Sequence, residues 1–358
     1  MRRGIFLILL TTVMNVVAQK NIKGKLEELK ELKSRALVVA IFEEDKDYTE
    51  KLTKKISKAK KEKKKEKLQK ELSGYVNHIN YFNKTIKEVI PEYWRLNSIE
   101  NVKYLTGKEI EELRKEKNTD YAILDLREDE VVTTDAFGRF FDLNVNAVTY
   151  GFSEKKRRKS VYNNYFINTN YNLPEKYKGQ QEEYVEALKR EKEGKEKILS
   201  KENIVCTLTL IQNHINKAIE LNKKISFEDF ALEQVQNNCS ELKGKKVLFQ
   251  SAIVHGKILD QLKDFYSLGE IELVSSERIT EALNNNEDVI IGFPIIKRLV
   301  KMKGSFGAVG SVTVRPMDNK ALMNAKTKKF VGLVKHSGLL AFRDFRKKDF
   351  QKLNKQCE

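Results

Sequence analysis

Apolar runs of strand length alternate with amphipathic segments of helix length, and the same order occurs twice along the chain. In the first half, the expected elements are strands at Ala36–Phe42, Asn101–Leu105 and Tyr121–Leu126, with helices at Val76–Tyr93 and Gly107–Lys117. Apolar runs bounded by charge are typical of buried strands, and apolar residues at helical spacing are typical of amphipathic helices. The pattern predicts a β-α-β-α-β unit.

The second half repeats this order. Its expected elements are strands at Val247–Ala252, Ile271–Val274 and Val289–Phe293 and helices at Lys257–Tyr266 and Ser276–Leu283. Asp120 and Asp288 directly precede the last expected strand of each half, where a polar residue ends the loop. The predicted fold class is α/β (α+β), with two tandem units.

An ungapped alignment supports the duplication. Segment Ile86–Val102 aligns with Ile258–Val274 at an offset of 172 residues (258 − 86). Five pairs are identical: Ile86/Ile258, Leu96/Leu268, Ile99/Ile271, Glu100/Glu272 and Val102/Val274. Repeats of this kind indicate a duplicated fold but do not name a reaction. We therefore expect the two units to superpose.

Each unit is predicted to end in a β-hairpin around a charged turn. The hairpin strands are expected at Asn146–Phe152 and Val161–Ile167 around Glu154–Lys159, and at Ala321–Ala325 and Phe330–Val334 around Lys326–Lys329, with Ser311–Arg315 as a further strand.

Three further segments are predicted to be helical. Asn21–Ser34 is a short amphipathic lead-in. Lys51–Lys70 is almost entirely Lys and Glu, so we expect an exposed helical extension, continuous or not with the following helix. In Asn203–Leu221, an apolar face predicts a packed connector; its members are Val205, Leu208, Ile211, Ile215 and Ile219.

The first residues are typical of a secretory signal. Arg2 and Arg3 precede the apolar run Ile5–Leu10, and small residues predict cleavage before Gln19. The alternative is a retained anchor, but the run is shorter than the roughly 20 residues that a spanning helix needs. The Ala-Gln junction resembles those of exported proteins of Bacteroidota-type bacteria. The expected location is the periplasm, the outer membrane surface or the extracellular space.

The expected organisation follows from these assignments. It comprises a signal peptide at 1–18, a first α/β domain at 19–175 with a lysine-rich helical insertion at about 45–75, a helical connector at 176–243, a second α/β domain at 244–345 and a basic tail at 346–358.

The net charge is strongly positive and suggests acidic partners. The formal charge of the 358-residue chain is +17, and removal of Arg2 and Arg3 leaves +15. Export argues against nucleic acid, so the expected partners are envelope proteins, an anionic polymer or a lipid surface. The candidate binding residues are Lys155, Lys156, Arg157, Arg158, Lys159, Lys297, Arg298, Lys301 and Lys303.

The phrase Val102–Leu124 (VKYLTGKEIEELRKEKNTDYAIL) resembles the N-terminal domain of the periplasmic translocation protein TolB and the periplasmic domain of curli-export proteins. Leu273–Ile291 matches more loosely. The resemblance implies an α/β periplasmic domain. The chain lacks the lipid-anchored cysteine of the curli exporters and the propeller repeats of TolB, so neither full function carries over.

Motifs for catalysis, metal or nucleotide binding are missing from the sequence. Its four histidines show no zinc spacing, and we expect His78 and His214 to have surface or capping roles. The glycine-rich Lys303–Gly310 leads into a strand-like segment, so it predicts a loop between strands rather than a phosphate cradle. The acidic residues between Asp125 and Asp142 lack calcium-loop spacing and indicate a solvated loop.

The three cysteines leave two alternatives. Cys206 and Cys239 either pair or remain two buried thiols, while Cys357 is a candidate for intermolecular pairing. No cofactor is predicted. The sequence favours a non-enzymatic binding or assembly module of the envelope. The alternative is an envelope hydrolase or transferase with a site between the two domains, for which His255 and Asp260 are the candidates.

Overall fold

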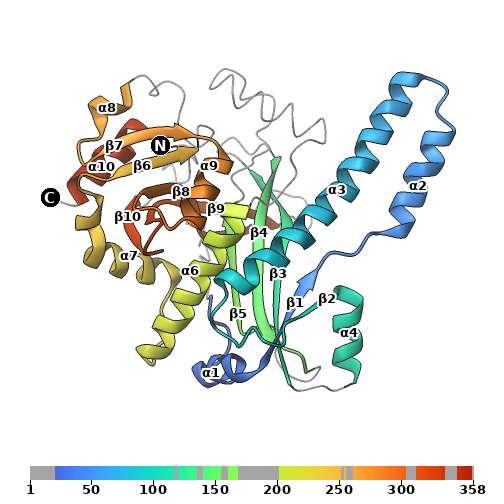
Figure 1. Ribbon diagram of the computed structural model, residues 1–358, viewed down its shortest axis with the longest axis horizontal. Coiled ribbons are helices and arrows are strands. Elements are labelled where there is room, and N and C mark those ends of the chain that lie inside the picture. The colour runs from blue at the N-terminus through green and yellow to red at the C-terminus, as the bar shows by residue number, and fades with distance from the viewer. Residues whose placement is uncertain are drawn as a thin grey trace, which may run out of the picture.

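Two five-stranded mixed sheets of the same topology form the frame of the protein (Figure 1). The computed structural model describes residues 21–116, 120–134, 140–154, 160–167, 201–250, 254, 261–303, 312–334 and 345–356. The predicted α/β fold class with two units is confirmed.

The first sheet has the strand order β2-β1-β3-β4-β5. Strand β1 lies parallel to β2 and β3, and β3, β4 and β5 continue as an antiparallel meander. Its elements are β1 (Ala36–Ile41), α2 (Lys46–Ser57), α3 (Glu62–Tyr93), β2 (Lys103–Thr106), α4 (Gly107–Lys115), β3 (Tyr121–Thr134), β4 (Phe140–Phe152) and β5 (Tyr162–Ile167).

The second sheet repeats this plan with the strand order β7-β6-β8-β9-β10. Strand β6 lies parallel to β7 and β8, and the last three strands are antiparallel. Its elements are β6 (Lys246–Gln250), α8 (Leu262–Phe265), β7 (Glu270–Val274), α9 (Ser276–Asn284), β8 (Ile290–Lys303), β9 (Val312–Asn324) and β10 (Phe330–Val334). Since β2 and β7 occupy the same edge of their sheets, the predicted duplication is confirmed at the level of topology.

The helix caps correct the predicted alignment. Thr106 caps α4 and Ser275 caps α9, each accepting a hydrogen bond from the backbone N–H three residues later. The offset between these caps is 169 residues (275 − 106), not 172. Trp94 and Tyr266 are both buried just after α3 and α8 and keep the offset of 172 (266 − 94). The first unit therefore has three extra residues before β2, and the identity of Val102 with Val274 is not a structural equivalence.

Both hairpins are longer than predicted. Strands β3 and β8 continue to Thr134 and Lys303, well beyond the apolar runs that predicted these strands. The expected separate strand at Ser311–Arg315 is the start of β9. The acidic residues expected in a solvated loop lie instead in two paired strands: Asp125, Glu128, Asp129 and Glu130 in β3 and Asp142 in β4, while Asp135 is outside the described residues.

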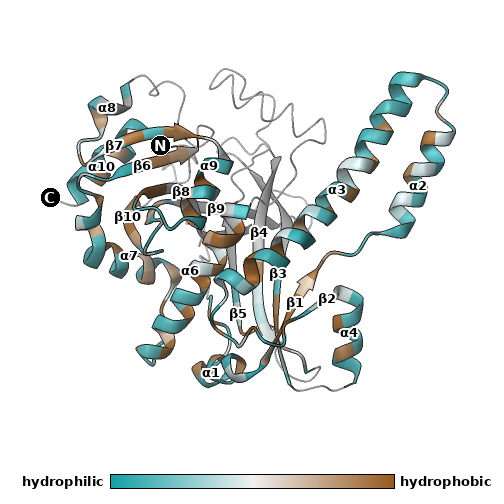
Figure 2. Cartoon of the chain, in the orientation of Figure 1, coloured by the Kyte–Doolittle hydropathy of each residue, from teal (hydrophilic) through white to brown (hydrophobic). Residues whose placement is uncertain are grey.

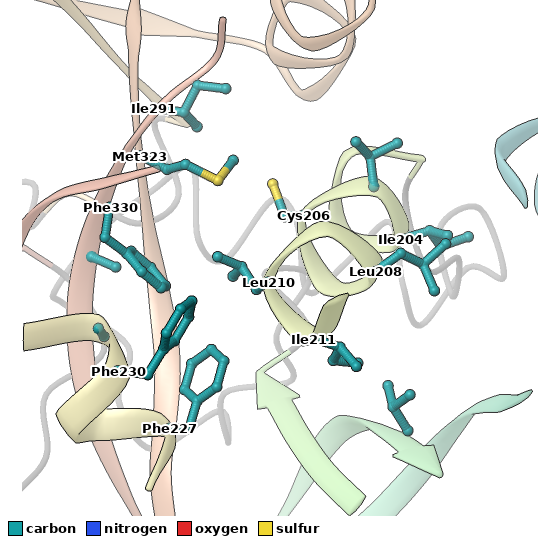
Figure 3. Close-up of a cluster of buried hydrophobic side chains, with 14 of the residues drawn as sticks. Ile204, Cys206, Leu208, Leu210, Ile211, Phe227, Phe230, Ile291, Met323 and Phe330 are labelled. Atoms are coloured by element: carbon teal, nitrogen blue, oxygen red, sulfur yellow. The ribbon is translucent and has the colours of Figure 1, made fainter. Parts of the chain in front are cut away.

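Helix α6 (Lys201–Glu220) packs between the two units and belongs to the core of both. It contacts α3 of the first unit and α9 of the second. Figure 3 shows its side chains Cys206 and Leu210 directed toward Met323 and Phe230, with Leu208 and Ile211 on its other sides. Of the predicted apolar stripe, Val205, Leu208, Ile211 and Ile215 are buried and Ile219 is half-buried. The connector is thus a central element.

The other helices of the described residues close the core. These are α1 (Leu26–Ser34), α7 (Phe227–Asn238), the short 3-10 helix η2 (Cys239–Leu242) and α10 (Lys347–Gln356). Helix α1 buries Leu26, Leu29 and Leu32, as its spacing predicts. Helix α10 packs against β10 and α8 through Phe350 and Leu353.

A buried ion pair fixes α10 to the second sheet. The Nζ of Lys320 in β9 contacts the Asp349 carboxylate, and the two side chains are 0% and 7% exposed. The same carboxylate accepts a hydrogen bond of 2.9 Å from the backbone N–H of Arg346. Burying a charge is tolerated only when it is paired and hydrogen-bonded, so each partner depends on the other.

Candidate functional site

The structure brings none of the predicted binding clusters into a described site. Residues Lys155, Lys156, Arg157, Arg158 and Lys159 lie outside the described residues. The second basic cluster belongs to β8, with Lys297, Arg298, Lys301 and Lys303 along its outer half. The glycine-rich segment that follows Lys303 connects β8 to β9, as predicted, and its residues 304–311 lie outside the described part.

The two candidate residues for the alternative, enzymatic function are His255 and Asp260. Both lie outside the described residues. Within the part of the chain that is described, no group of three or more His, Cys, Asp or Glu residues has the geometry to hold a metal ion. The described helices also include none that is both long and apolar enough to cross a membrane.

His214 is a core residue, and its predicted surface or capping role is wrong. It is fully buried on α6, where its Nδ1 and the Tyr162 hydroxyl lie 3.0 Å apart and its Nε2 lies 3.0 Å from the Ile225 carbonyl oxygen. The carbonyl can only accept, so Nε2 donates and Nδ1 accepts from the tyrosine. The rings of Phe227 and Phe230 surround it. Burial lowers the pKa of His214 to about 4, so the ring is neutral at pH 7.

The cysteines follow neither of the two predicted alternatives. Cys239 is disulfide-bonded, whereas Cys206 on α6 carries a buried thiol, so these two do not pair with each other. Cys357 lies outside the described residues.

A polar cluster lies at the seam between the units, close to where the enzymatic reading expected a site. The Tyr93 hydroxyl donates to Asn284 over 2.9 Å, joining α3 to α9. Lys328, in the β9–β10 turn, donates through Nζ to the carbonyl oxygens of Leu283 (2.8 Å) and Ala325 and lies 6.0 Å from the Tyr93 ring centre. Burial lowers the pKa of Lys328 and raises that of Tyr93.

These contacts give the seam a structural role. A lysine of lowered pKa can act as a base, but here its ammonium protons are directed at two backbone carbonyls. The Lys328 carbonyl in turn accepts from the Asn213 amide over 3.3 Å, which links the turn to α6. Sequence reasoning missed this cluster, because only the fold brings α3, α6 and the β9–β10 turn together.

The most prominent feature outside the core is an arm formed by α2 and the N-terminal half of α3. The two helices run antiparallel around a turn at Lys58–Lys61 and project away from both sheets (Figure 1). The predicted helical extension at Lys51–Lys70 is therefore not one helix but a helical hairpin, although its second half is continuous with the helix ending at Tyr93.

Contacts at the base of the arm fix its position. The Asn83 side chain makes two hydrogen bonds of 2.9 Å, one from the backbone N–H and one to the carbonyl of Phe42, just after β1. Farther out, the ring of Tyr48 meets that of Tyr75 at 4.9 Å, and its hydroxyl donates to Glu71 over 2.9 Å. Leu52 is the only fully buried residue of α2. The arm thus has a defined direction but a thin core.

Positive charge is concentrated on the outer part of this arm. Lys51–Lys70 contains eleven lysines and two glutamates, a formal charge of +9 out of +17 for the whole chain. All of its lysines except Lys65 are classed as exposed. Figure 2 shows the arm as mainly hydrophilic along both helices. Exposed lysines at this density attract anionic groups over a range that salt shortens.

Comparisons with known proteins give no counterpart. No protein family, no curated protein and no solved structure matches this chain.

Proposed function

We propose that the protein is an exported, non-enzymatic module of the cell envelope that docks envelope proteins or anionic surface material through the lysine-rich arm. The single observation that carries the proposal is the separation of charge from core. About half of the net charge of the chain lies on a projecting segment that adds little to the packing of either sheet.

Two further observations support the proposal. The disulfide at Cys239 fits an oxidising compartment, as export to the envelope would provide. The polar seam at Lys328 and Tyr93 is occupied by hydrogen bonds that join the units, so its reactive groups already have a structural task. Both favour a binding role over catalysis.

The proposal is tested by crosslinking in intact cells. A photo-crosslinking amino acid is placed at Lys60, in the turn of the arm, and as a matched control at Lys223, an exposed position after α6. We expect an envelope component to be captured from position 60 and not from position 223. Equal capture from both positions, or capture from neither, would contradict a docking role for the arm.

Salt provides an independent reading of the same interaction. Between 0.1 M and 1 M salt the Debye length falls from about 10 Å to about 3 Å, which screens exposed charges. We expect the purified protein to bind isolated envelopes at low salt and to be released at high salt. Retention that is indifferent to salt would show that the lysines serve solubility alone.

A further inference from the structure

The lysines of the arm are arranged in two matching rows. Along α2, Lys51, Lys55 and the C-cap residue Lys58 are spaced i, i+4, i+7. In α3, Lys63, Lys67 and Lys70 repeat the same spacing. With 3.6 residues per turn, each set of three falls within about 60° of the helix circumference. Each helix therefore presents one basic stripe.

The two stripes lie on the same side of the arm. The contact between the helices is marked by Leu52 in α2, by Leu68 and Leu72 in α3 and by the ring contact between Tyr48 and Tyr75. In both helices the lysine stripe is rotated from this contact in the same sense, by roughly 70–90° in α2 and roughly 140° in α3 at 100° per residue. Antiparallel neighbours are related by a twofold axis perpendicular to their plane, so rotations in the same sense place both stripes on one face. We call these six lysines the basic face.

Acidic residues are few on this side of the arm. Glu62 is rotated from the contact in the opposite sense, and Glu50 and Glu66 point away from the contact. Glu62 and Glu50 lie 3.9 Å and 3.6 Å from Lys65 and Lys54, respectively. Glu71, four residues after Lys67, lies on the side of the basic face, where its carboxylate accepts a hydrogen bond from the Tyr48 hydroxyl. Lysines therefore outnumber acidic residues on this side of the arm.

We infer that the basic face lies flat on an anionic lipid bilayer surface, an inference that rests on the proposed function. Packed helices are about 8–10 Å apart, and lysines at these spacings rise by about 4.5–6 Å along each helix. Two rows at such distances match a plane of headgroups, whereas a single polymer chain would follow one row. Lysine clusters on helices are typical of contacts with anionic lipid.

The basic face can make electrostatic contact with lipid headgroups, but it has no exposed apolar side chains to insert between the acyl chains. Leu52, Ile56 and Leu68 turn toward the partner helix and are buried or half-buried, and the face carries no exposed aromatic residue. Binding should therefore depend on anionic lipid and on salt, and not on hydrophobic penetration of the acyl chains.

The test compares two variants of the full chain with equal loss of charge. In the face variant, Lys51, Lys55, Lys63 and Lys67 are changed to Gln. In the control variant, Lys46, Lys60, Lys61 and Lys65, which lie in the turn or off the basic face, are changed to Gln. Co-sedimentation uses vesicles of phosphatidylcholine with about one-third phosphatidylglycerol, and vesicles of phosphatidylcholine alone. We expect the face variant to lose at least about tenfold in affinity for the anionic vesicles and the control variant much less.

Several results would overturn the inference. Equal losses in the two variants would mean diffuse attraction with no oriented face, and equal binding to the neutral vesicles would mean that charge is not the determinant. Binding to soluble polyphosphate but not to vesicles would identify a linear polyanion as the partner. If vesicles are not bound while crosslinking at position 60 still captures an envelope component, the lipid inference fails and the proposed function stands. Circular dichroism confirms that each variant is folded.

Discussion

The connection between the first two strands differs more between the two units than any other part of their shared topology. In the first unit, residues 42–102 link β1 to β2 and include α2 and the 32-residue α3. In the second, residues 251–269 link β6 to β7, and the described helix α8 has four residues. The same place in the fold thus tolerates a long connection or a short one, which shows that the arm is an addition to the α/β unit.

The short connection of the second unit packs against a helix near the end of the chain. Helix α10 packs on α8, where the Asn354 side chain donates to the Phe265 carbonyl (2.9 Å) and accepts from the Ser267 N–H (3.1 Å). Phe350 meets Tyr266, the counterpart of Trp94, at a ring distance of 6.1 Å. In the first unit, Trp94 instead meets the Tyr150 ring of β4 at a ring distance of 5.7 Å. Stability in the second unit should therefore depend on α10, and in the first on the inner half of α3.

The largest effect is expected at the ion pair that fixes α10. Asp349→Ala leaves the fully buried Lys320 without its carboxylate, and removal of one partner of a buried pair typically costs about 3–5 kcal/mol. Urea denaturation measures the loss. The double variant Lys320→Met/Asp349→Leu removes both charges and should recover most of it. A single variant as stable as the wild type would show that α10 is dispensable for the second unit.

The two halves of α3 should respond very differently to truncation of an apolar side chain. Ile86 is fully buried against the first sheet, so Ile86→Ala should destabilise the protein by about 2–5 kcal/mol. Leu68, half-buried in the arm, is the matched control, and Leu68→Ala should cost less than about 1 kcal/mol. The free energies of unfolding of the two variants, each compared with the wild type, measure this difference. Similar losses would mean that the arm shares the core of the unit.

Acid should lower the stability of the protein through His214 on α6, the helix that packs in the core of both units. The pKa of His214 is about 4 in the folded chain and 6.5 in the unfolded chain, so the unfolded state binds the proton first. Stability should fall as the pH drops from 6.5 to 4, by up to about 3 kcal/mol at 1.36 kcal/mol per pKa unit. Unfolding at pH 7 and pH 4.5 measures the difference between the wild type and His214→Gln. An unchanged pH dependence in the variant would contradict this account.

The smallest effect on stability is expected from shortening the arm. Replacing residues 51–68 with a short Gly/Ser turn joins two points that face each other across the helix pair, since Tyr48 already contacts Glu71. The midpoint of thermal unfolding should shift by no more than about 2 °C, because exposed lysines add little to packing. Loss of a cooperative transition would show that the arm is part of the folded core.

The sequence predicts the repeated order of elements because buried strands and amphipathic helices leave local patterns. It does not predict the turn at Lys58–Lys61, since this stretch has no Gly or Pro and lysine favours helix. The reversal is decided by contacts between residues 27 positions apart, Tyr48 and Tyr75. Likewise, identical residues placed Val102 opposite Val274, but only the caps at Thr106 and Ser275 reveal the three-residue shift.

For the site, composition identifies the lysine-rich segment but not its sidedness. The basic face exists because two helices fold back on each other, and a linear reading places Lys51 and Lys70 far apart. His214 shows the opposite case, because its position between Ile211 and Ile215 on the apolar face of α6 was a usable signal of burial. A histidine on such a face is better read as a core residue.

The shared helix α6 also bears on the history of the chain. A freshly duplicated unit can be lost again as long as each copy is complete by itself. Once Leu210 packs toward Phe230 beside the second sheet, and Ile211 lies over the first, deletion of either copy exposes an apolar side of the same helix (Figure 3). Loss of either copy would therefore leave part of the apolar surface of α6 in contact with water, which costs about 25 cal/mol per Å².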